Sequence, residues 1–476
     1  MPRDILAFPK LNLLSHEQCE TIHHASLELL RRTGVRILHP DALDLLRQTD
    51  AVITDKTLVR FPPGLVEWAL KQAPSRIVLC KRGTSQAAIR MEGMEVAFGS
   101  GSDCNNYLNP RTGQHELFTA KTEVDCIHVV DALPEIDFCM SMGVPSDLND
   151  GISPFRHQFA LMLAHTTKPI VFISADRADC EAIVAMAAAV AGGIEQLRLN
   201  PTLLGYSQAT TPLIHPAESL GKLLYMAEQG LPTVHMPSPM MGGTAPVTMA
   251  GALAVGNAEV LSGLVLAQLK RAGTPVVYSQ GTHHMDMKTT ISVYGAPEFE
   301  LARIALADMA RLYNLPNWGY AGYSDSCIMD EQAAADATSS VWTALLSGQH
   351  LAHDVGYLEA GLTTSPEMIV FTAEVVNRTR HFMQGFSLDA ESLALDLIHE
   401  LGPGGQYLTT QHTLKHFREM WQPRLFSRQR MADWVRGGKQ RLGNRLRDKT
   451  LSIIESHRPE PLPDHVLAEI DYILKG

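Results

Sequence analysis

The sequence predicts an α/β fold: a (β/α)8, TIM-type barrel with an N-terminal, mostly helical cap and a helical C-terminal extension. Of the 476 residues, 45% are hydrophobic, which is enough to bury a large core. From about residue 95, eight short apolar runs alternate with helix-like stretches, the pattern of a parallel barrel. We expect the cap over residues 1–92, the catalytic barrel over 93–362 and the extension over 363–476.

The cap is predicted from three helical segments. The first helix begins at Ser15, whose hydroxyl can cap it, and ends at Gly34. A second helix follows Pro40, and PPGLVEWALKQAP contains a third. No catalytic motif falls in this region.

Eight apolar runs provide the strands of the barrel. Many of the helical patterns between them end in Gly, and many runs start at Pro, as short connections require. The runs are 94–100, 136–144, 169–175, 202–209, 232–238, 274–281, 315–322 and 350–357. A doubly wound open sheet is the competing architecture, but FGSGSDCNN matches a phosphate-binding GxGxxG only loosely and no helix follows it at once.

Composition and charge exclude several classes of protein. A net charge of -11 argues against a nucleic-acid partner, because phosphate binding needs a basic face. The seven cysteines are scattered and form no CxxC pair, so neither a disulfide framework nor a cysteine zinc site is indicated. Without a signal peptide or an apolar run of membrane length, we expect a cytoplasmic protein with no membrane partner.

The chemistry is expected at the carboxyl ends of the strands, where barrels of this kind bind ligands. Aromatic residues gather there in a chain with only 6% aromatics, and aromatic faces hold quaternary ammonium groups, which donate no hydrogen bond. The alternative is that the rings only fill the top layer of the barrel. The rings are those of Tyr206, Tyr278, Trp318, Tyr320, Tyr323 and Tyr357.

Polar groups at the same ends complete the predicted site. His350 and His353 are three residues apart and would face opposite sides of a strand, so we expect no metal bound by this chain. His353 beside Asp354 is expected to serve as an orienting group. The other polar candidates for substrate binding are Asn105, Gln208 and Gln280.

Three segments together resemble one known family. They are GGTAPVTMAGALAVGNAEVLSGLVLAQ, GYAGYSDSCIMDEQAAADA and SGQHLAHDVGYLEAGLT. They resemble the trimethylamine:corrinoid methyltransferase superfamily, and the resemblance covers most of the chain. It implies a barrel whose mouth receives a separate, cognate corrinoid-binding protein, so that the corrinoid (cobalamin) is carried by that partner.

The resemblance also bears on the substrate. Members that use trimethylamine carry pyrrolysine just before a Ser-Asp pair, and that position here is Tyr323. The chain therefore resembles the members without pyrrolysine, which implies a small quaternary amine as methyl donor. Glycine betaine, giving dimethylglycine, is the first expectation; proline betaine, carnitine and γ-butyrobetaine are alternatives.

The chemistry of a quaternary amine explains why pyrrolysine is dispensable. The nitrogen is already positive, so a Co(I) corrinoid can attack the methyl carbon directly and a neutral tertiary amine departs. Opposite charges disappear together, and a dry site lowers the barrier. Orientation of the two reactants can contribute about 7–11 kcal/mol.

Roles follow for the residues at the barrel mouth. We expect Tyr323, Asp325 and Glu359 to be catalytic. The other rings should enclose the ammonium, while His350, His353, Asn105, Gln208 and Gln280 should bind the carboxylate, because no arginine lies at a predicted strand end. The loop with Gly242, Gly243 and Thr244 should face the corrinoid.

Other functions remain open at this stage. A zinc-dependent methyltransferase would need a Cys/His triad at strand ends, which is not found. A methyltetrahydrofolate enzyme would need a pterin pocket, for which Asp103, Asn105, Asp147 and Asp325 are available. A non-catalytic quaternary-amine-binding barrel is the third alternative. We expect a homo-oligomer.

Overall fold

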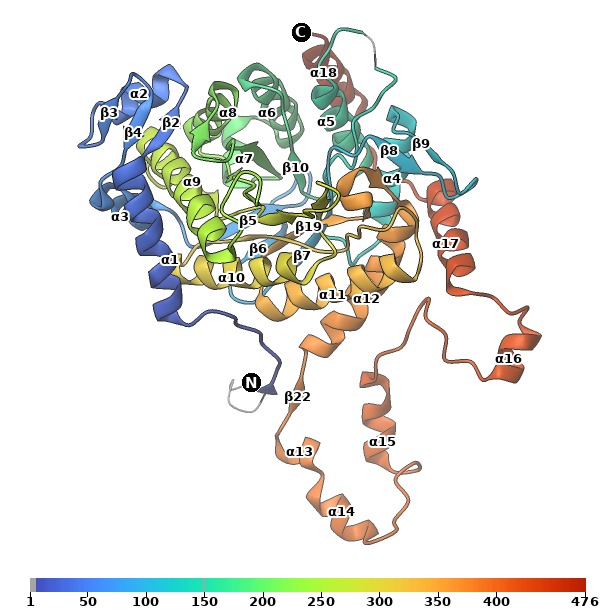
Figure 1. The fold of residues 1–476 in the computed structure, drawn as a ribbon. Helices are drawn as coiled ribbons and strands as arrows, with labels where there is room; N and C mark the ends of the chain where they lie inside the picture. Colours follow the sequence, from blue (N-terminus) through green and yellow to red (C-terminus); the bar gives the residue numbers. More distant parts are fainter. Residues whose placement is uncertain (1–5, 149) are drawn as a thin grey trace.

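Parallel strands form the centre of the molecule, and helices cover them (Figure 1). The computed structural model describes residues 6–148 and 150–476. Seven strands lie where the sequence predicts them: β7 (Ala97–Ser100), β10 (Ile170–Phe172), β11 (Leu203–Gln208), β13 (Thr233–Met236), β15 (Val276–Val277), β18 (Trp318–Tyr320) and β19 (Leu351–Val355). The predicted α/β fold with parallel sheets is confirmed.

The strands pair in sequence order. β10, β11, β13 and β15 form one parallel sheet, and β18, β19 and β7 form another. A parallel bridge between Tyr278 and Asn317 connects the two sheets on one side. On the other side, Phe138 bridges to Gly99 and Cys139 bridges to Ile170. The parallel pairings thus run from β7 through every strand and return to β7.

The second predicted strand, 136–144, makes these two bridges but no regular ladder. The carbonyl of Phe98 accepts from the amides of both Asp137 and Phe138, at 2.6 and 3.3 Å. The amide of Met140 donates to the hydroxyl of Ser100 at 2.8 Å instead of to a backbone carbonyl. A side chain that competes for ladder hydrogen bonds leaves the segment extended but irregular.

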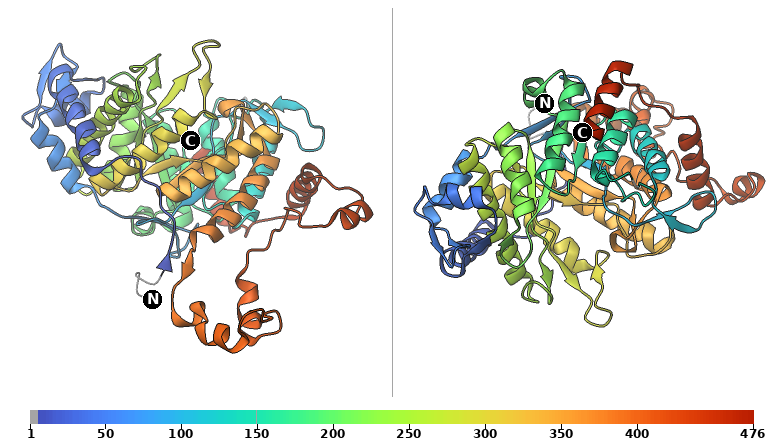
Figure 2. Two further views of the ribbon diagram at one scale, coloured as in Figure 1. Left: turned by 60° about the horizontal axis from the view of Figure 1, so that its bottom comes forward. Right: turned by 90° about the horizontal axis from the view of Figure 1, so that it is seen from above.

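Helices alternate with the strands and pack side by side around them (Figure 2). They are α4 (Ala120–Ala132), α5 (Pro154–His165), α6 (Arg177–Ala191), α7 (Ile194–Leu199), α8 (Ala217–Gln229), α9 (Met249–Lys270), α10 (Pro297–Tyr313), α11 (Glu331–Ser347) and α12 (Pro366–Met383). The expected end of the barrel at residue 362 falls before α12. That helix contacts both α11 and α4, so the packing of helices also closes on itself.

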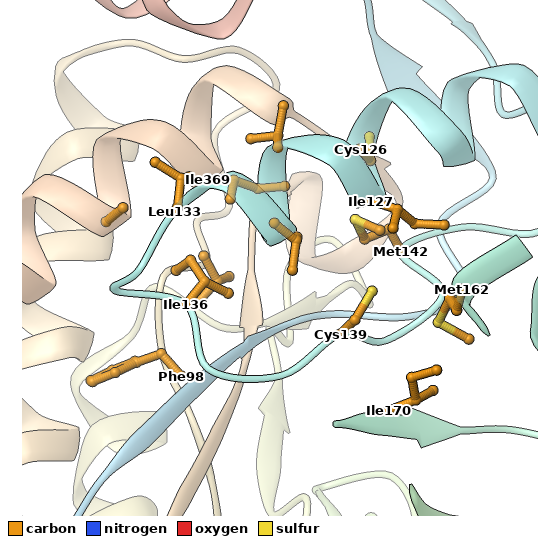
Figure 3. Packing of buried hydrophobic residues seen from close by; sticks show 14 of the residues in the cluster. Phe98, Cys126, Ile127, Leu133, Ile136, Cys139, Met142, Met162, Ile170 and Ile369 are labelled. Atoms are coloured by element: carbon orange, nitrogen blue, oxygen red, sulfur yellow. The ribbon is translucent and has the colours of Figure 1, made fainter. Parts of the chain in front are cut away.

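The core lies between the strands and this layer of helices. Figure 3 shows part of it, where Phe98 and Ile136 lie beneath Leu133 and Ile369, with Ile127 alongside. Helix α9 is long and apolar enough to cross a membrane, but 83% of its most apolar window is buried inside the protein. Its Ala, Gly, Leu and Val side chains therefore belong to the core.

The N-terminal region contains the three predicted helical segments: α1 (His16–Glu28) with the π-turn η2 (Leu29–Thr33), α2 (Pro40–Leu46) and α3 (Pro63–Gln72). Ser15 and Gln18 form a capping box at α1. The region also contains strands that a mostly helical cap did not include: β2 (Val35–Ile37), β3 (Val52–Thr54) and β4 (Leu58–Arg60), which form a sheet with β12 (Ile214–His215). At three residues or fewer each, they are too short to show a period of two.

A hairpin of β5 (Ile77–Cys80) and β6 (Ala87–Met91) follows the cap. The amide of Cys80 donates to the carbonyl of Pro201, just before β11, so the hairpin lies at the amino ends of the parallel strands. Ile77, Leu79 and Ile89 are buried in the same cluster as the side chains inside the strands.

Further short strands lie in the loops at the carboxyl ends of the parallel strands. They are β8 (Asn106–Leu108), β9 (His115–Leu117), β14 (Met240–Met241), β16 (His283–Met285), β17 (Ser292–Val293), β20 (Tyr357–Leu358) and β21 (Thr363–Thr364). A 3-10 turn, η3 (Glu359–Gly361), connects the last two of these strands.

The C-terminal region leaves the body and returns to it. The outer part contains β22 (Phe386–Ser387), which pairs with β1 (Leu6–Ala7), then α13 (Ala390–Leu393), α14 (Leu395–Leu401), α15 (Gln411–His416), η4 (Phe417–Glu419) and α16 (Met431–Arg436). The last two helices, α17 (Leu442–Ser456) and α18 (Asp464–Lys475), pack on α4, α5, α6 and α12.

Candidate active site

Aromatic rings from three strands meet inside the parallel strands, toward their carboxyl ends. Trp318 and Tyr320 are two residues apart on β18, so both point to the same face. The His353 ring, from β19, lies with its centroid 4.7 Å from the Trp318 ring and 4.4 Å from the Tyr320 ring. Tyr206, from β11, lies 5.9 Å from Trp318. All four residues are buried, and the structure brings these four predicted residues together.

The two phenols of this cluster converge on one sulfur atom. The hydroxyl of Tyr320 lies 2.8 Å from Sδ of Met236, and that of Tyr206 lies 3.5 Å from it. Gln208, also predicted, donates from Nε2 to the Tyr206 hydroxyl at 2.9 Å. Burial raises the pKa of both tyrosines, and the Asp354 carboxylate raises it further. Both phenols therefore stay protonated and neutral at neutral pH.

Asp354 is the charged group of this cluster. Its side chain is 1% exposed and its φ is +77°, at an irregularity where the register between β19 and β7 shifts. Its Oδ1 lies 2.7 Å from Nδ1 of His353, but the two groups are not aligned as a hydrogen bond, and neither carboxylate oxygen has a hydrogen-bond partner among the described residues. A buried carboxylate is costly without such partners, and a non-glycine residue at positive φ adds strain. Both features are typical of active sites and ligand-binding sites.

An arginine that sequence reasoning missed lies at the edge of the cluster. Arg303, on α10, is 1% exposed, and its guanidinium carbon lies 4.4 Å from the Phe299 ring centre and 4.5 Å from that of Tyr320. It donates to the carbonyl of Gln280 at 2.8 Å and to that of Thr282. Its Nε has no partner among the residues that the structure describes. The only signal in the sequence was a charge within the apolar face of a helix.

Two predicted residues face the opposite way. Strand alternation turns Val277 into the interior and Tyr278 outward, toward α9. The Tyr278 hydroxyl donates to Oδ1 of Asn257 at 2.9 Å, and Nε2 of Gln280 lies 3.3 Å from the carbonyl of Leu253. Tyr278 and Gln280 therefore pack between β15 and α9, away from Trp318 and Tyr320.

His350 and Asn105 also lie apart from the aromatic cluster. His350 precedes β19 at the amino end of the strands, where its Nδ1 accepts from the amide of Asn317 at 3.1 Å. Burial lowers the pKa of His350 to about 4, so it is neutral at physiological pH. Asn105 is exposed, next to β8, and its carbonyl accepts from the amide of Phe118.

Tyr323 lies next to the cluster rather than within it. Its ring meets those of Phe299 and Tyr294 edge-on, at 5.2 and 5.7 Å, and its hydroxyl donates to Oε1 of Glu300 at 2.5 Å. A cavity of about 430 Å³ between α10 and α11 borders Tyr323 and Glu300. Burial raises the pKa of Glu300.

The other two residues expected to be catalytic have structural partners. Asp325 accepts from the amides of Tyr294 and Gly295, each at 2.9 Å, just before α10 begins. Glu359 accepts from the hydroxyl of Thr363 at 2.8 Å. Neither carboxylate is placed with the Trp318 ring.

Tyr357 contributes to the same buried cluster, but its hydroxyl is engaged. It accepts a hydrogen bond from the amide of Ser102 at 2.5 Å and donates one to the Ser102 carbonyl. A Cβ on Gly101 would overlap the Tyr357 ring, so only glycine allows this close approach.

The loop expected to face the corrinoid is an exposed turn after β14. Gly242 has a φ of +86° and its amide donates to the carbonyl of Ala245 at 3.0 Å. The hydroxyl of Thr244 accepts from the amide of Met240, and Gly243 is exposed. The exposed side chains of Val247 and Met287 lie beside Gly242.

Comparisons with known proteins identify the family of the chain. The family model for trimethylamine methyltransferase (MTTB) matches residues 3–475. A trimethylamine methyltransferase MttB of Desulfitobacterium hafniense is 30% identical over 97% of this chain and 93% of its own length. A glycine betaine methyltransferase of Desulfitobacterium hafniense (strain Y51) is 28% identical over 97% of this chain and 96% of its own length.

The fold has a counterpart among solved structures. The monomethylamine methyltransferase (MtmB) of Methanosarcina barkeri superposes with a TM-score of 0.54 over 94% of this chain and 89% of its own, at 13% identity. The resemblance noted from the three sequence segments is thereby confirmed. With a family model that matches nearly its whole length, the chain belongs to the trimethylamine methyltransferase (MTTB) family.

Proposed function

We propose that this protein moves a methyl group from a quaternary amine, glycine betaine in the first instance, to the Co(I) corrinoid of a cognate corrinoid protein. The other betaines named above are the alternative donors. In this proposal the cyclic strand pairing is a (β/α)8 barrel that extends from β7 through α12, and the site lies at its mouth. The protein would work in the cytoplasm.

One observation supports a cationic substrate above the others: the Asp354 carboxylate is buried next to the His353 ring, without a hydrogen-bond partner among the described residues. A quaternary ammonium donates no hydrogen bond, so it suits a carboxylate that lacks donors and rings that present their faces. An amine with N–H groups would instead need several acceptors.

Arg303 supplies what a betaine needs at its other end. Its guanidinium lies against the Tyr320 ring, its Nε has no partner within residues 6–148 and 150–476, and an arginine is suited to a carboxylate. Sequence reasoning assigned this task to neutral donors because no arginine was expected there. Asp354 and Arg303 together match a zwitterion in which the two charges are held apart.

The residues of the chain would act by orientation and by excluding water. Trp318, Tyr320 and Tyr206 would hold the ammonium so that one methyl points to the open end of the barrel. The corrinoid, held by the partner, would supply the cobalt nucleophile. The N–CH3 bond breaks, its electron pair stays on nitrogen, and the methyl bonds to cobalt, so no protein group transfers a proton. Low polarity favours this loss of charge.

The turn after β14 fits a docking partner. Gly242, Gly243 and Thr244 are accessible there, and two exposed apolar side chains, Val247 and Met287, flank the turn. Apolar groups on the surface at such a place are typical of interaction sites.

The proposal is tested by absorbance spectroscopy of a reduced corrinoid protein. With this enzyme and glycine betaine, the Co(I) spectrum should convert to that of methylated Co(III), while trimethylamine should give no conversion. If another betaine works and glycine betaine does not, the substrate is corrected. If trimethylamine is the donor, or if no quaternary amine reacts with Co(I), the proposed function is wrong.

A further inference from the structure

The segment from Phe386 to Met420, here called the arm, extends from the body of the protein. It comprises β22, α13, α14, α15 and η4. Figure 1 shows it projecting away from the body, and in the left view of Figure 2 it lies on the side opposite the yellow β16–β17 hairpin. Helix α12 ends where the arm begins, at the end of the molecule opposite the barrel mouth.

The arm carries many apolar side chains that the described part of the chain leaves exposed. None of its helices contains a buried residue. Ten of its large hydrophobic side chains are exposed: Phe386, Leu388, Leu393, Leu395, Ile398, Tyr407, Leu408, Leu414, Phe417 and Met420. Together they present on the order of 800 Å², about what each partner buries in a standard specific interface.

The arm nevertheless has a defined shape. Asp389 caps α13 by accepting from the amide of Ser392 at 2.8 Å, and Thr410 caps α15. Glu391 connects the two limbs of the arm through ion pairs with Lys415 and His416. Helices of four to seven residues are marginal unless they pack on another surface.

The arm is also fixed where it joins the body. Antiparallel pairing of Ala7 with Phe386 connects it to the N-terminal segment. Just beyond it, Nε1 of Trp421 donates to Oδ1 of Asn377, on α12, at 2.8 Å. An arm that is held at both ends and ordered along its length presents its apolar side chains in fixed places.

We propose that the arm packs against a second copy of this chain and is the main contact of a homo-oligomer. The corrinoid partner is not its occupant, because that protein must meet the mouth at the other end of the molecule. Five acidic and two basic residues make the arm net negative, which disfavours anionic membranes and nucleic acid. An apolar surface of this extent is typical of permanent contacts between identical subunits.

The test is the mass of the full-length protein in solution, measured by light scattering after gel filtration. The wild-type chain should have a mass of at least twice 52.2 kDa. Leu395→Asp combined with Leu408→Asp should reduce it to that of a single chain. These side chains are 61% and 74% exposed, so the substitutions disturb no contact within the chain, and circular dichroism should be unchanged.

Leu199→Asp is the matched control, because Leu199 is 73% exposed on α7, away from the arm. It should leave the mass of the wild type unchanged. The single substitution Leu408→Asp should weaken association in the same direction, seen as dissociation on dilution. A monomeric wild type, an unchanged mass for the double variant, or equal dissociation by Leu199→Asp would overturn the proposal. None of these readings depends on methyl transfer.

Discussion

At the scale of single residues, Asp354 is an acidic side chain that is buried without a hydrogen-bond partner in the part of the chain that the structure describes. Asp354→Asn keeps the shape and removes the charge, so the affinity for a quaternary amine should fall about tenfold or more, or roughly 1.4 kcal/mol and upward. Calorimetric titration with glycine betaine measures this. Thermal stability should stay the same or rise, because the change breaks no hydrogen bond.

Glu359→Gln is the comparison for that experiment. It also removes one negative charge near the mouth, but Glu359 is bonded to Thr363 and lies outside the aromatic cluster. Its affinity for the amine should match the wild type. If Glu359→Gln weakens binding of the amine and Asp354→Asn does not, Glu359 is the functional carboxylate, as the sequence predicted, and the role inferred for Asp354 is wrong.

A second residue links stability to pH. Glu259, on α9, is fully buried, and burial raises its pKa to about 7 although it accepts from Leu213 and Thr211. In the unfolded chain its pKa is near the usual 4.5. The folded state therefore holds a proton that the unfolded state has lost, and this contribution to stability is lost as pH rises toward 7.

Glu259→Gln should remove this dependence. Its free energy of unfolding relative to that of the wild type should increase between pH 5 and pH 7, by roughly 3 kcal/mol at most, and then level off. Differential scanning calorimetry across this range measures the effect. A constant difference between the two proteins at all pH values would contradict the assigned pKa.

At the scale of elements, Asp325 fastens the loop that leads from β17 into α10. Asp325→Ala leaves the amides of Tyr294 and Gly295 without their acceptor, and we expect a loss of about 1–2 kcal/mol. Thermal unfolding and faster proteolysis within residues 286–296 would report it. Glu298→Ala is the control, since it removes an exposed charge from the first turn of the same helix without these bonds. Equal losses in both variants would indicate a helix-dipole effect instead.

The elements show how far a sequence can be interpreted. Helices with an apolar face and a clear start were predictable, such as α1 with its capping box and α3 with proline in its first turn. The apolar runs that became β11 and β19 were predictable too. The segment 136–144 was apolar enough, but the hydroxyl of Ser100 takes a ladder bond, which composition does not reveal.

Side-chain direction was the harder part of the site. Trp318, Tyr320, His353 and Tyr206 could be assigned to strand ends, and they do meet. Tyr278 satisfied the same rule but faces α9, because the register of a two-residue strand is set by its neighbours. Arg303 could not be found from strand ends at all, since a helix carries it.

At the scale of the whole molecule, length and periodicity were sufficient for the α/β architecture, while the arm was not foreseen as a separate feature. The sequence of the arm reads as an ordinary charged, helical extension with scattered leucines. Only the three-dimensional arrangement shows that the described part of the chain leaves those leucines exposed.

The β5–β6 hairpin has a consequence for the order of events during turnover. It lies across the amino ends of the strands, so the barrel that we propose is open only at the carboxyl ends of its strands. In the proposed function, the amine would enter, and the demethylated product would leave, by the opening that the docked corrinoid protein would cover. Binding would then be ordered: the amine binds before the corrinoid protein, and the product leaves only after the corrinoid protein has dissociated.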